Sequence, residues 1–286
     1  MQNKNSISVT DAYSQALTFA KTHYENFPVV SLLIPKRLKK HIAIVYWFAR
    51  TADDIADEGN VSEKIRLEKL NEFEDEFKNS LEGNSSNGYE IALSNTITER
   101  KLTPKYFTDL LSAFKQDVTK RRYANFDEVL NYCKRSANPV GRIILELFDI
   151  RNEKANEYSD KICTALQLTN FLQDTIIDYK KGRIYLAKDE MQNFGVTDFL
   201  FEQKENNYNF KRLVKHNVER IYGFFDEGKN LLTFLNGKLR AEINWTILGG
   251  EEILLQIKKN DFDILNHRPE LSKIKMAGLL INSFIS

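Results

Sequence analysis

The sequence predicts an all-α protein, and three observations carry that prediction. The 286-residue chain contains only 12 Gly and 5 Pro, the residues that most often interrupt helices and form turns. Leu, Ile, Lys and Glu are plentiful, and all four are compatible with helix. Helical patterns also follow one another along most of the chain. Neither an internal repeat nor a shift in composition marks a boundary, so we expect residues 1–286 to form a single domain.

The expected helices can be placed in order. A first helix is predicted over residues 11–24, and a long one over residues 36–58, ended by Gly59 as a left-handed terminator. Residues 81–88 (LEGNSSNG) form a low-complexity loop. The Ser159-Asp160 pair is expected to cap a helix that runs to about residue 180. The other helical stretches are predicted near 89–99, 104–119, 126–150 (disturbed by Asn138-Pro139), 208–237, 239–259 and 270–285.

Charge and composition exclude several function classes. The formal net charge is +1, from 41 basic and 40 acidic residues, so no global field attracts nucleic acid. Cys133 and Cys163 show neither metal-site spacing nor a disulfide framework, which suits a reducing cytoplasm. The N-terminus lacks a secretory pattern, and no apolar run approaches the roughly 20 residues that span a bilayer. The apolar stretch 276–285 leaves open a peripheral contact with the inner face of a membrane.

The first candidate site lies on the helix that ends near Glu58. Its polar side chains are spaced by four, three and four residues and fall within an arc of about 60°. Two carboxylates on one helical stripe can share a ligand. The alternative is a solvated acidic helix end, but acids at a helix C-terminus oppose the macrodipole. These four residues are Tyr46, Arg50, Asp53 and Asp57.

A second stripe has the same kind of spacing, within an arc of about 80°. It consists of Gln167, Asn170, Asp174 and Asp178. The rest of this helix is apolar nearly all round, which predicts burial. Buried carboxylates must be paired or bind metal, and oxygen ligands favour Mg²⁺ over zinc. The alternative to metal binding is that these carboxylates form structural ion pairs with lysines.

Two such pairs facing each other would bind a cluster of Mg²⁺ ions, whose coordination the oxygens of a diphosphate could complete. Metal ions would also stabilise the charge that develops on the diphosphate as a C–O bond ionises. Arg50, Arg183 and the pair Lys180-Lys181 supply nearby cations. Arginine is better suited than lysine to bidentate phosphate contact.

These residues resemble those of a known family. The runs YWFARTADDIADEG (46–59) and QLTNFLQDTIIDYKKGRIYL (167–186) are similar to the two aspartate-rich signatures of the squalene/phytoene synthases, the head-to-head prenyl synthases. The resemblance covers residues from about 20 to 275. It implies an isoprenoid synthase helical bundle around a central apolar cavity.

Four further runs resemble most closely the bacterial hopanoid-pathway branch of that family, whose enzyme converts presqualene diphosphate and water to hydroxysqualene. SANPVGR at 136–142 carries most of this likeness. The four runs are HYENFPVVSLLIP (23–35), QDVTKRRYANFDEVLNYCKRSANPVGR (116–142), GRIYLAKDEMQNFGV (182–196) and DFDILNHRPELS (261–272). At one position the family often has Tyr before Asp, whereas here Phe262 precedes Asp263, so no catalytic phenol is expected there.

The resemblance implies a role for each matching residue. The Mg²⁺ ligands would be Asp53, Asp57, Asp174 and Asp178, with Asn170 and Gln167 completing the polar stripe. Arg50, Arg183 and Tyr185 would bind the diphosphate, and His23 and Asn26 would sit at the phosphate end of the first helix turn. Tyr132 would face the reacting carbons, and the cavity would be lined by Phe27, Tyr46, Val140 and Leu166. Ser136 and Asn138, close in sequence to Tyr132, could hold a water beside the carbocation.

Alternatives remain within and outside this activity. A squalene, dehydrosqualene or phytoene synthase would condense two farnesyl or geranylgeranyl diphosphates. A non-catalytic relative acting as an assembly factor would typically lose aspartates, and this chain keeps all four. The expected partners are a presqualene or farnesyl diphosphate substrate, a presqualene diphosphate synthase that supplies it, and a membrane surface for the lipophilic product.

Overall fold

The prediction of an all-α protein is confirmed. The computed structural model describes residues 7–22, 33–85 and 87–284, and these form α-helices, one short 3₁₀ helix and a single isolated bridge between Arg122 and Ile184. The chain divides into two compact units. Unit 1 comprises the residues up to Thr119 together with Arg142–Arg151, and unit 2 comprises Lys120–Gly141 and the residues from Asn152 onward. The expectation of one domain stays a prediction.

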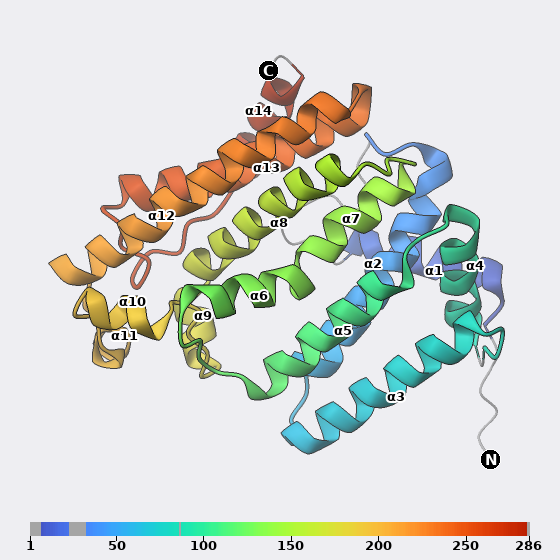
Figure 1. The fold of residues 1–286 in the computed structure, drawn as a ribbon, viewed down its shortest axis with the longest axis horizontal. Coiled ribbons are helices and arrows are strands. Elements are labelled where there is room, and N and C mark those ends of the chain that lie inside the picture. The colour runs from blue at the N-terminus through green and yellow to red at the C-terminus, as the bar shows by residue number, and fades with distance from the viewer. Residues whose placement is uncertain (1–6, 23–32, 86, 285–286) are drawn as a thin grey trace. The chain divides into compact units, whose positions relative to one another are not determined.

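Unit 1 is built around helix α2. Its Phe48 ring lies 5.1 Å from those of Phe73 and Phe77 and 5.3 Å from that of Phe107, so one apolar cluster joins three helices. Burial of such aromatic rings contributes most of the stabilisation of a helical core. The helices of unit 1 are α1 (Val9–Thr22), α2 (Lys36–Asp57), α3 (Glu63–Leu81), α4 (Gly88–Arg100) and α5 (Pro104–Thr119), coloured from blue to green in Figure 1.

Unit 2 is organised along α8, against which α6, α12 and α13 pack. The final helix α14 packs on α13 (Figure 1). In chain order, the elements after α5 are α6 (Phe126–Ser136), α7 (Asn138–Leu147), α8 (Glu153–Gln173), α9 (Thr175–Lys180), α10 (Lys188–Asn193), α11 (Asp198–Gln203), α12 (Tyr208–Gly228), the 3₁₀ helix η1 (Lys229–Phe234), α13 (Gly237–Lys259) and α14 (Lys273–Ser283). Residues of α7 from Arg142 onward belong to unit 1.

Three expectations about the helices were wrong. Sequence reasoning missed α3, which Ser62 caps through a 3.4 Å bond from the Ile65 amide; few of its residues are buried, so its apolar stripe is weak. The short helices α10 and α11 were also missed. The expected cap at Ser159-Asp160 lies inside α8, which begins seven residues earlier because the Asn152 side chain accepts the Ala155 amide.

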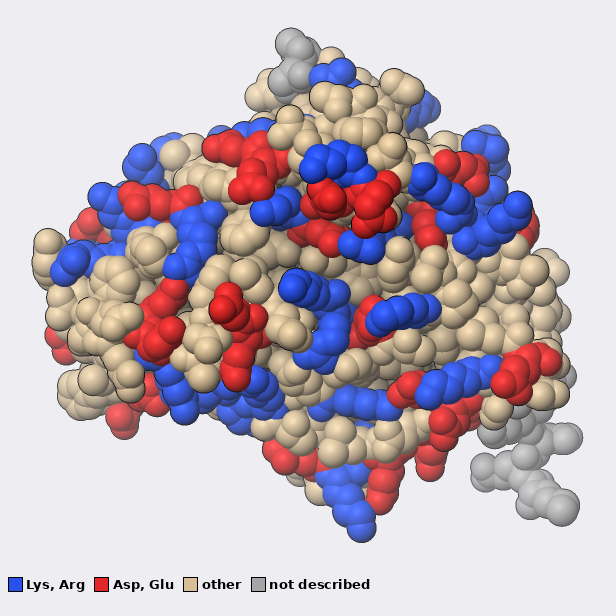
Figure 2. Space-filling model, viewed as in Figure 1, with Lys and Arg blue, Asp and Glu red and all other residues tan. Residues whose placement is uncertain are grey.

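The surface carries charges of both signs. Figure 2 shows Lys and Arg side chains interspersed with Asp and Glu over the face in view, in keeping with the balanced net charge. Among the described residues, no helix combines the length and apolar character needed to cross a bilayer.

Gly141 marks the closest helix approach in unit 2. A Cβ atom built at this position would lie 2.3 Å from the Ser159 hydroxyl and 2.6 Å from the Cys163 sulfur, well inside van der Waals contact. The first turn of α7 therefore meets α8 at a distance that only glycine permits. Gly223 on α12 is exposed, and a Cβ atom built there would meet nothing within 4 Å.

We expect Gly141→Ala to lower the free energy of unfolding by about 1–3 kcal/mol, because the added methyl group forces α7 away from Ser159 and Cys163. Gly223→Ala is the matched control and should be neutral or stabilising by up to about 1 kcal/mol. Urea denaturation of both variants and the parent measures the difference. Equal stability of the two variants would contradict the close approach.

Candidate functional site

The first aspartate motif surrounds a single arginine in unit 1. Arg50 on α2 contacts three carboxylates: Nε lies 2.7 Å from Asp54, Nη1 lies 3.2 Å from Asp53, and Nη2 lies 3.0 Å from Glu58. The guanidinium therefore reaches Asp54, which lies outside the predicted stripe, as well as Asp53. Asp57 lies one turn beyond Asp53 and is partly exposed.

The unfavourable position of these acids at a helix C-terminus is offset by Arg66. Its guanidinium, on α3, donates to four main-chain carbonyls at the end of α2. The acceptors are Ile55 (3.2 Å), Ala56 (2.9 Å), Glu58 (2.8 Å) and Gly59 (2.6 Å). A cation here satisfies the last carbonyls and opposes the negative end of the macrodipole. No local spacing in the sequence signals this contact, and sequence reasoning missed it.

The second motif lies in unit 2, where a helix is interrupted. α8 ends at Gln173, α9 begins at Thr175, and Asp174 between them has φ −101° and ψ 13°. The Thr175 hydroxyl donates to the carbonyls of Phe171 (2.8 Å) and Leu172 (3.1 Å), stabilising the break. Asp174 and Asp178 thus stand on consecutive helical segments and not on one continuous stripe. Ile177 is 42% exposed, so the helix is less buried than its sequence predicts.

Arg268 pairs with Asp174. Its Nε lies 2.7 Å from the Asp174 Oδ1 atom, and its Nη1 lies 2.9 Å from Glu270. Next to this pair, the buried Gln173 side chain donates to the Pro269 carbonyl at 2.8 Å. The end of α8 is therefore fastened to a segment almost a hundred residues later. The family-like run 261–272 contains Arg268, but no role was predicted for this residue. Its position as the one arginine in that run is the only sequence signal of the contact.

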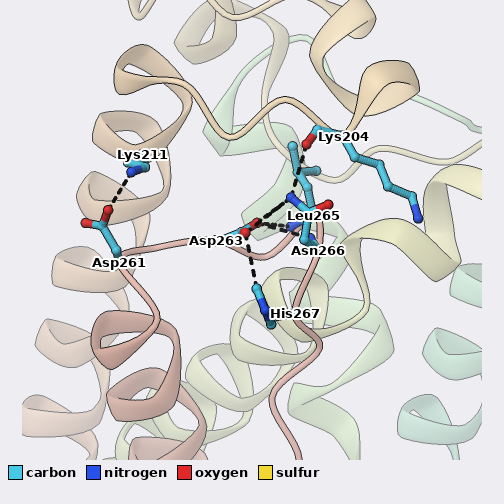
Figure 3. A network of polar contacts seen from close by, with 7 residues as sticks. All are labelled: Lys204, Lys211, Asp261, Asp263, Leu265, Asn266 and His267. Carbon is cyan, nitrogen blue, oxygen red and sulfur yellow. Dashed lines mark hydrogen bonds and ion pairs between the residues drawn. The ribbon is translucent and has the colours of Figure 1, made fainter.

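A network centred on Asp263 holds the loop that carries Arg268 (Figure 3). One carboxylate oxygen of Asp263 accepts the amides of Leu265 (3.1 Å) and Asn266 (3.0 Å), and the other lies 3.2 Å from His267 Nδ1. The Asn266 side chain also donates to the Lys204 carbonyl at 3.1 Å. These bonds form an Asx-type turn that fixes the chain just before Arg268.

Aromatic side chains gather beside the second motif. The rings of Phe171 and Tyr185 are stacked with centroids 3.7 Å apart, and the buried Tyr132 ring lies 6.0 Å from each. Tyr123 completes the cluster, 5.8 Å from Tyr132. Tyr132, which the sequence singled out for the reacting carbons, therefore stands in the same unit as Asp174 and Asp178, within an aromatic cluster.

Two adjoining pockets share the stacked pair. The first is small, with a volume of about 10 Å³, and is lined by Asp178, Arg183 and Thr175, together with Phe171, Tyr185 and neighbouring side chains. Arg183 is only 8% exposed. The second pocket, about 20 Å³, shares Phe171, Tyr185 and Leu186 with the first. Its other lining residues are mostly apolar: Phe126, Val129, Leu168, Leu172, Ala187, Asn217 and Ile221. A charged recess thus adjoins an apolar one inside unit 2.

The other predicted site residues are placed as follows. Asn138 is buried, and its Oδ1 atom accepts the Thr164 hydroxyl at 3.0 Å, so this amide joins α7 to α8. The Ser136 hydroxyl is buried and has no hydrogen-bond partner within the described residues. Gln167 and Asn170 are half-buried on α8, and Tyr46 on α2 contacts the Phe19 ring. His23, Asn26 and Phe27 lie outside the described residues. Val140, expected to line the cavity, is 45% exposed.

Cysteine chemistry plays no part in this arrangement. Burial raises the pKa of both Cys133 and Cys163 to about 12, so both thiols stay protonated at neutral pH.

Across residues 7–22, 33–85 and 87–284, no three Asp, Glu, His or Cys side chains are grouped as a ready metal site. Asp53 and Asp57 belong to unit 1, and Asp174 and Asp178 to unit 2. Convergence of the four carboxylates on one metal cluster stays a prediction.

Comparison with known proteins identifies relatives over most of the chain. The squalene/phytoene synthase family matches residues 20–275. A hydroxysqualene synthase of Rhodopseudomonas palustris is 40% identical over 183 residues, covering 63% of this chain and 61% of that protein's length. A hydroxysqualene synthase of Sinorhizobium fredii is 30% identical over 88% of this chain and 85% of that protein. The crystal structure of squalene synthase HpnC from Alicyclobacillus acidocaldarius is 31% identical, with a TM-score of 0.84 over 89% of this chain and 96% of that one.

We expect Asp263→Ala to loosen the loop before Arg268. Loss of the two amide acceptors should speed hydrogen exchange at Leu265 and Asn266 by roughly 5- to 30-fold, the effect of about 1–2 kcal/mol of lost bonding. Lys211→Ala, which removes only the neighbouring pair with Asp261 drawn in Figure 3, is the control and should leave both amides unchanged. Unchanged exchange in Asp263→Ala would show that other contacts hold the loop.

Proposed function

Because the chain belongs to the squalene/phytoene synthase family, we propose that it is a diphosphate-releasing prenyl enzyme that converts presqualene diphosphate and water to hydroxysqualene, in hopanoid biosynthesis. The observation that carries this proposal is the pair of adjoining pockets beside the second aspartate motif. Both pockets are small, so their lining chemistry is what supports the proposal. One is lined by Asp178 and the buried Arg183, groups that suit a diphosphate and its metal, and the other is lined mostly by apolar side chains, which suit a hydrocarbon chain. The named relatives favour the hydroxysqualene branch.

The donor set fits Mg²⁺. Each motif offers two carboxylates separated by four residues, and oxygen-only ligands suit this hard cation. We propose that Asp53, Asp57, Asp174 and Asp178 hold the metal, with Asn170 as an additional oxygen ligand. When bound, Mg²⁺ supplies charge neutralisation on the diphosphate as its C–O bond ionises.

The cationic side chains act first in this proposal. Arg50 contacts Asp53 and Arg268 contacts Asp174, so both carboxylates are held in place before substrate arrives. The Arg183 guanidinium, buried beside Asp178, is suited to bidentate contact with a phosphate oxygen pair. Binding of the diphosphate would draw these positive groups toward its oxygens.

The aromatic cluster then protects the carbocation. The faces of aromatic rings attract cations through their quadrupoles, and the rings of Tyr132, Phe171 and Tyr185 form one cluster, two of whose members line the apolar pocket. We propose that these rings stabilise the cation and keep bulk water away from it. A premature quench would yield other alcohols.

A single positioned water would end the reaction. Asn138 already bonds to Thr164, whereas the buried Ser136 hydroxyl, one turn after Tyr132, lacks a partner among the described residues. Buried polar groups of this kind are commonly satisfied by ordered water. We therefore propose that Ser136 holds the attacking water and that Asn138 positions α7 beside it.

The surroundings of the reaction follow from its chemistry. The substrate would come from a presqualene diphosphate synthase, and the product would leave into a membrane from an enzyme bound at the cytoplasmic face. The same pockets would also serve condensation of two farnesyl diphosphates, as in squalene or dehydrosqualene synthases. Product analysis separates these reactions.

We expect Asp53→Asn and Asp174→Asn each to lower turnover of presqualene diphosphate by at least about two orders of magnitude, because each removes a charge that would bind Mg²⁺. Glu58→Gln removes a 64% exposed carboxylate that also contacts Arg50, and it should stay within about threefold of the parent. Steady-state release of diphosphate at saturating Mg²⁺ measures all three. Near-normal turnover of Asp174→Asn would exclude the metal assignment.

We further expect purified protein to form hydroxysqualene from presqualene diphosphate without a reductant, as determined by mass spectrometry of the extracted product. Ser136→Ala should lower the ratio of alcohol to hydrocarbon, because the water loses its acceptor. Ser14→Ala, which removes an exposed hydroxyl from α1, is the control and should leave the ratio unchanged. Formation of squalene or dehydrosqualene from two farnesyl diphosphates, with no alcohol from presqualene diphosphate, would replace the proposed reaction within the same family.

A further inference from the structure

The C-terminal helix α14 presents an apolar face to solvent. Ile274 is 87% exposed, Ile281 is 64% exposed and Phe284, just past the helix end, is 60% exposed. With the exposed Ala277, these side chains fall within an arc of about 80° at 100° per residue. A Cβ built at the neighbouring Gly278 would meet nothing within 4 Å, so this face has no cover among the described residues.

The opposite face of α14 is fastened to α13. The Trp245 indole donates to the Met276 carbonyl at 3.0 Å, and the Asn244 amide donates to the Ser283 carbonyl at 3.2 Å. Lys275 pairs with Glu252 at 2.9 Å. Because both ends of the helix are held, α14 cannot roll to bury its exposed side chains without breaking these contacts.

The charge around this face has one sign. α14 contains Lys273 and Lys275 and no acidic residue. Lys273 borders the apolar arc at the helix start, whereas Lys275 lies on the side of the helix that pairs with Glu252. In Figure 2, the part of the surface beside the grey C-terminal residues is tan with blue side chains. Apolar side chains bordered by lysines are typical of helices that lie in the interface of an anionic bilayer.

The size of the face argues against a second protein chain. A helix of 11 residues is about 16 Å long, and its apolar arc is one side-chain row wide. Stable protein dimers bury about 800 Å² on each partner, far more than such an arc offers. A bilayer makes no such demand, because each bulky side chain inserts independently among the acyl chains.

We propose that α14 docks this protein on an anionic lipid surface, with Ile274, Ile281 and Phe284 inserted below the headgroups and Lys273 contacting lipid phosphates. This surface deepens the proposed function by giving the lipophilic product a route into the bilayer. The observations behind the docking proposal do not depend on the proposed reaction. The docking proposal can therefore fail while the proposed reaction stands, and the reverse also holds.

Cosedimentation with vesicles tests the proposal. The full-length protein should bind vesicles of equimolar phosphatidylcholine and phosphatidylglycerol, and bind pure phosphatidylcholine vesicles more weakly. Ile274→Ser combined with Ile281→Ser should lower the partition coefficient at least tenfold, since each bulky apolar side chain contributes roughly that factor. Lys273→Gln should weaken binding only to the anionic vesicles.

The matched control is Phe199→Ser, which removes a 57% exposed aromatic side chain from α11 and should bind like the parent. Hydrolysis of substrate presented in detergent should be the same in all these proteins, which separates docking from chemistry. Equal vesicle binding by the double variant and the parent would overturn the proposal. The proposal would also be overturned if the parent protein did not bind the vesicles. It would likewise be overturned if light scattering showed that the parent is a dimer and that the double variant is a monomer.

Discussion

Compensation of carboxylate charge is the constraint on which the site depends. Asp53 and Asp57 stand near a helix C-terminus, where the macrodipole opposes them, and Asp174 stands at a helix break. Arginines contact these acids or the helix ends that carry them: Arg50 on the same helix and Arg66 on α3 in unit 1, and Arg268 in unit 2. Arginine suits this task because its guanidinium stays charged and makes several directed bonds at once. Asp53 and Asp174 are thereby held in defined orientations.

A second constraint is the meeting of polar and apolar chemistry within a few residues of α8. At the end of α8, Asp174 pairs with Arg268. Two and three residues earlier, Leu172 and Phe171 line an apolar pocket. Thr175 makes this possible, because its hydroxyl satisfies carbonyls that the helix break would otherwise leave unbonded. The stacked Phe171 and Tyr185 rings then form the wall that the charged and apolar pockets share.

Much of this could be predicted from local spacing, and the rest depends on contacts through space. The first aspartate stripe follows from the helical periodicity of α2, and the long helix predicted over 36–58 ends within a residue of its expected position. The break at Asp174 interrupts the second predicted stripe. The cap of α8 was misplaced because Asn152 and Ser159 are both good capping residues, and their sequence does not rank them. Arg66 and Arg268 were missed because the atoms they contact are set by tertiary packing, in the second case 94 residues away.

The Arg66 contacts also bear on the order of folding. Its four acceptor carbonyls lie only seven to eleven residues earlier in the chain, so the loop that must close between α2 and α3 is short. Short loops cost little entropy to close, and local contacts of this kind form early. The turn that ends the first aspartate motif can therefore form as a helical hairpin while the distant pairing of Asp174 with Arg268 is still unmade. The two aspartate motifs would then mature at different stages of synthesis, the first soon after residue 66 has emerged from the ribosome and the second only after residue 268 has emerged.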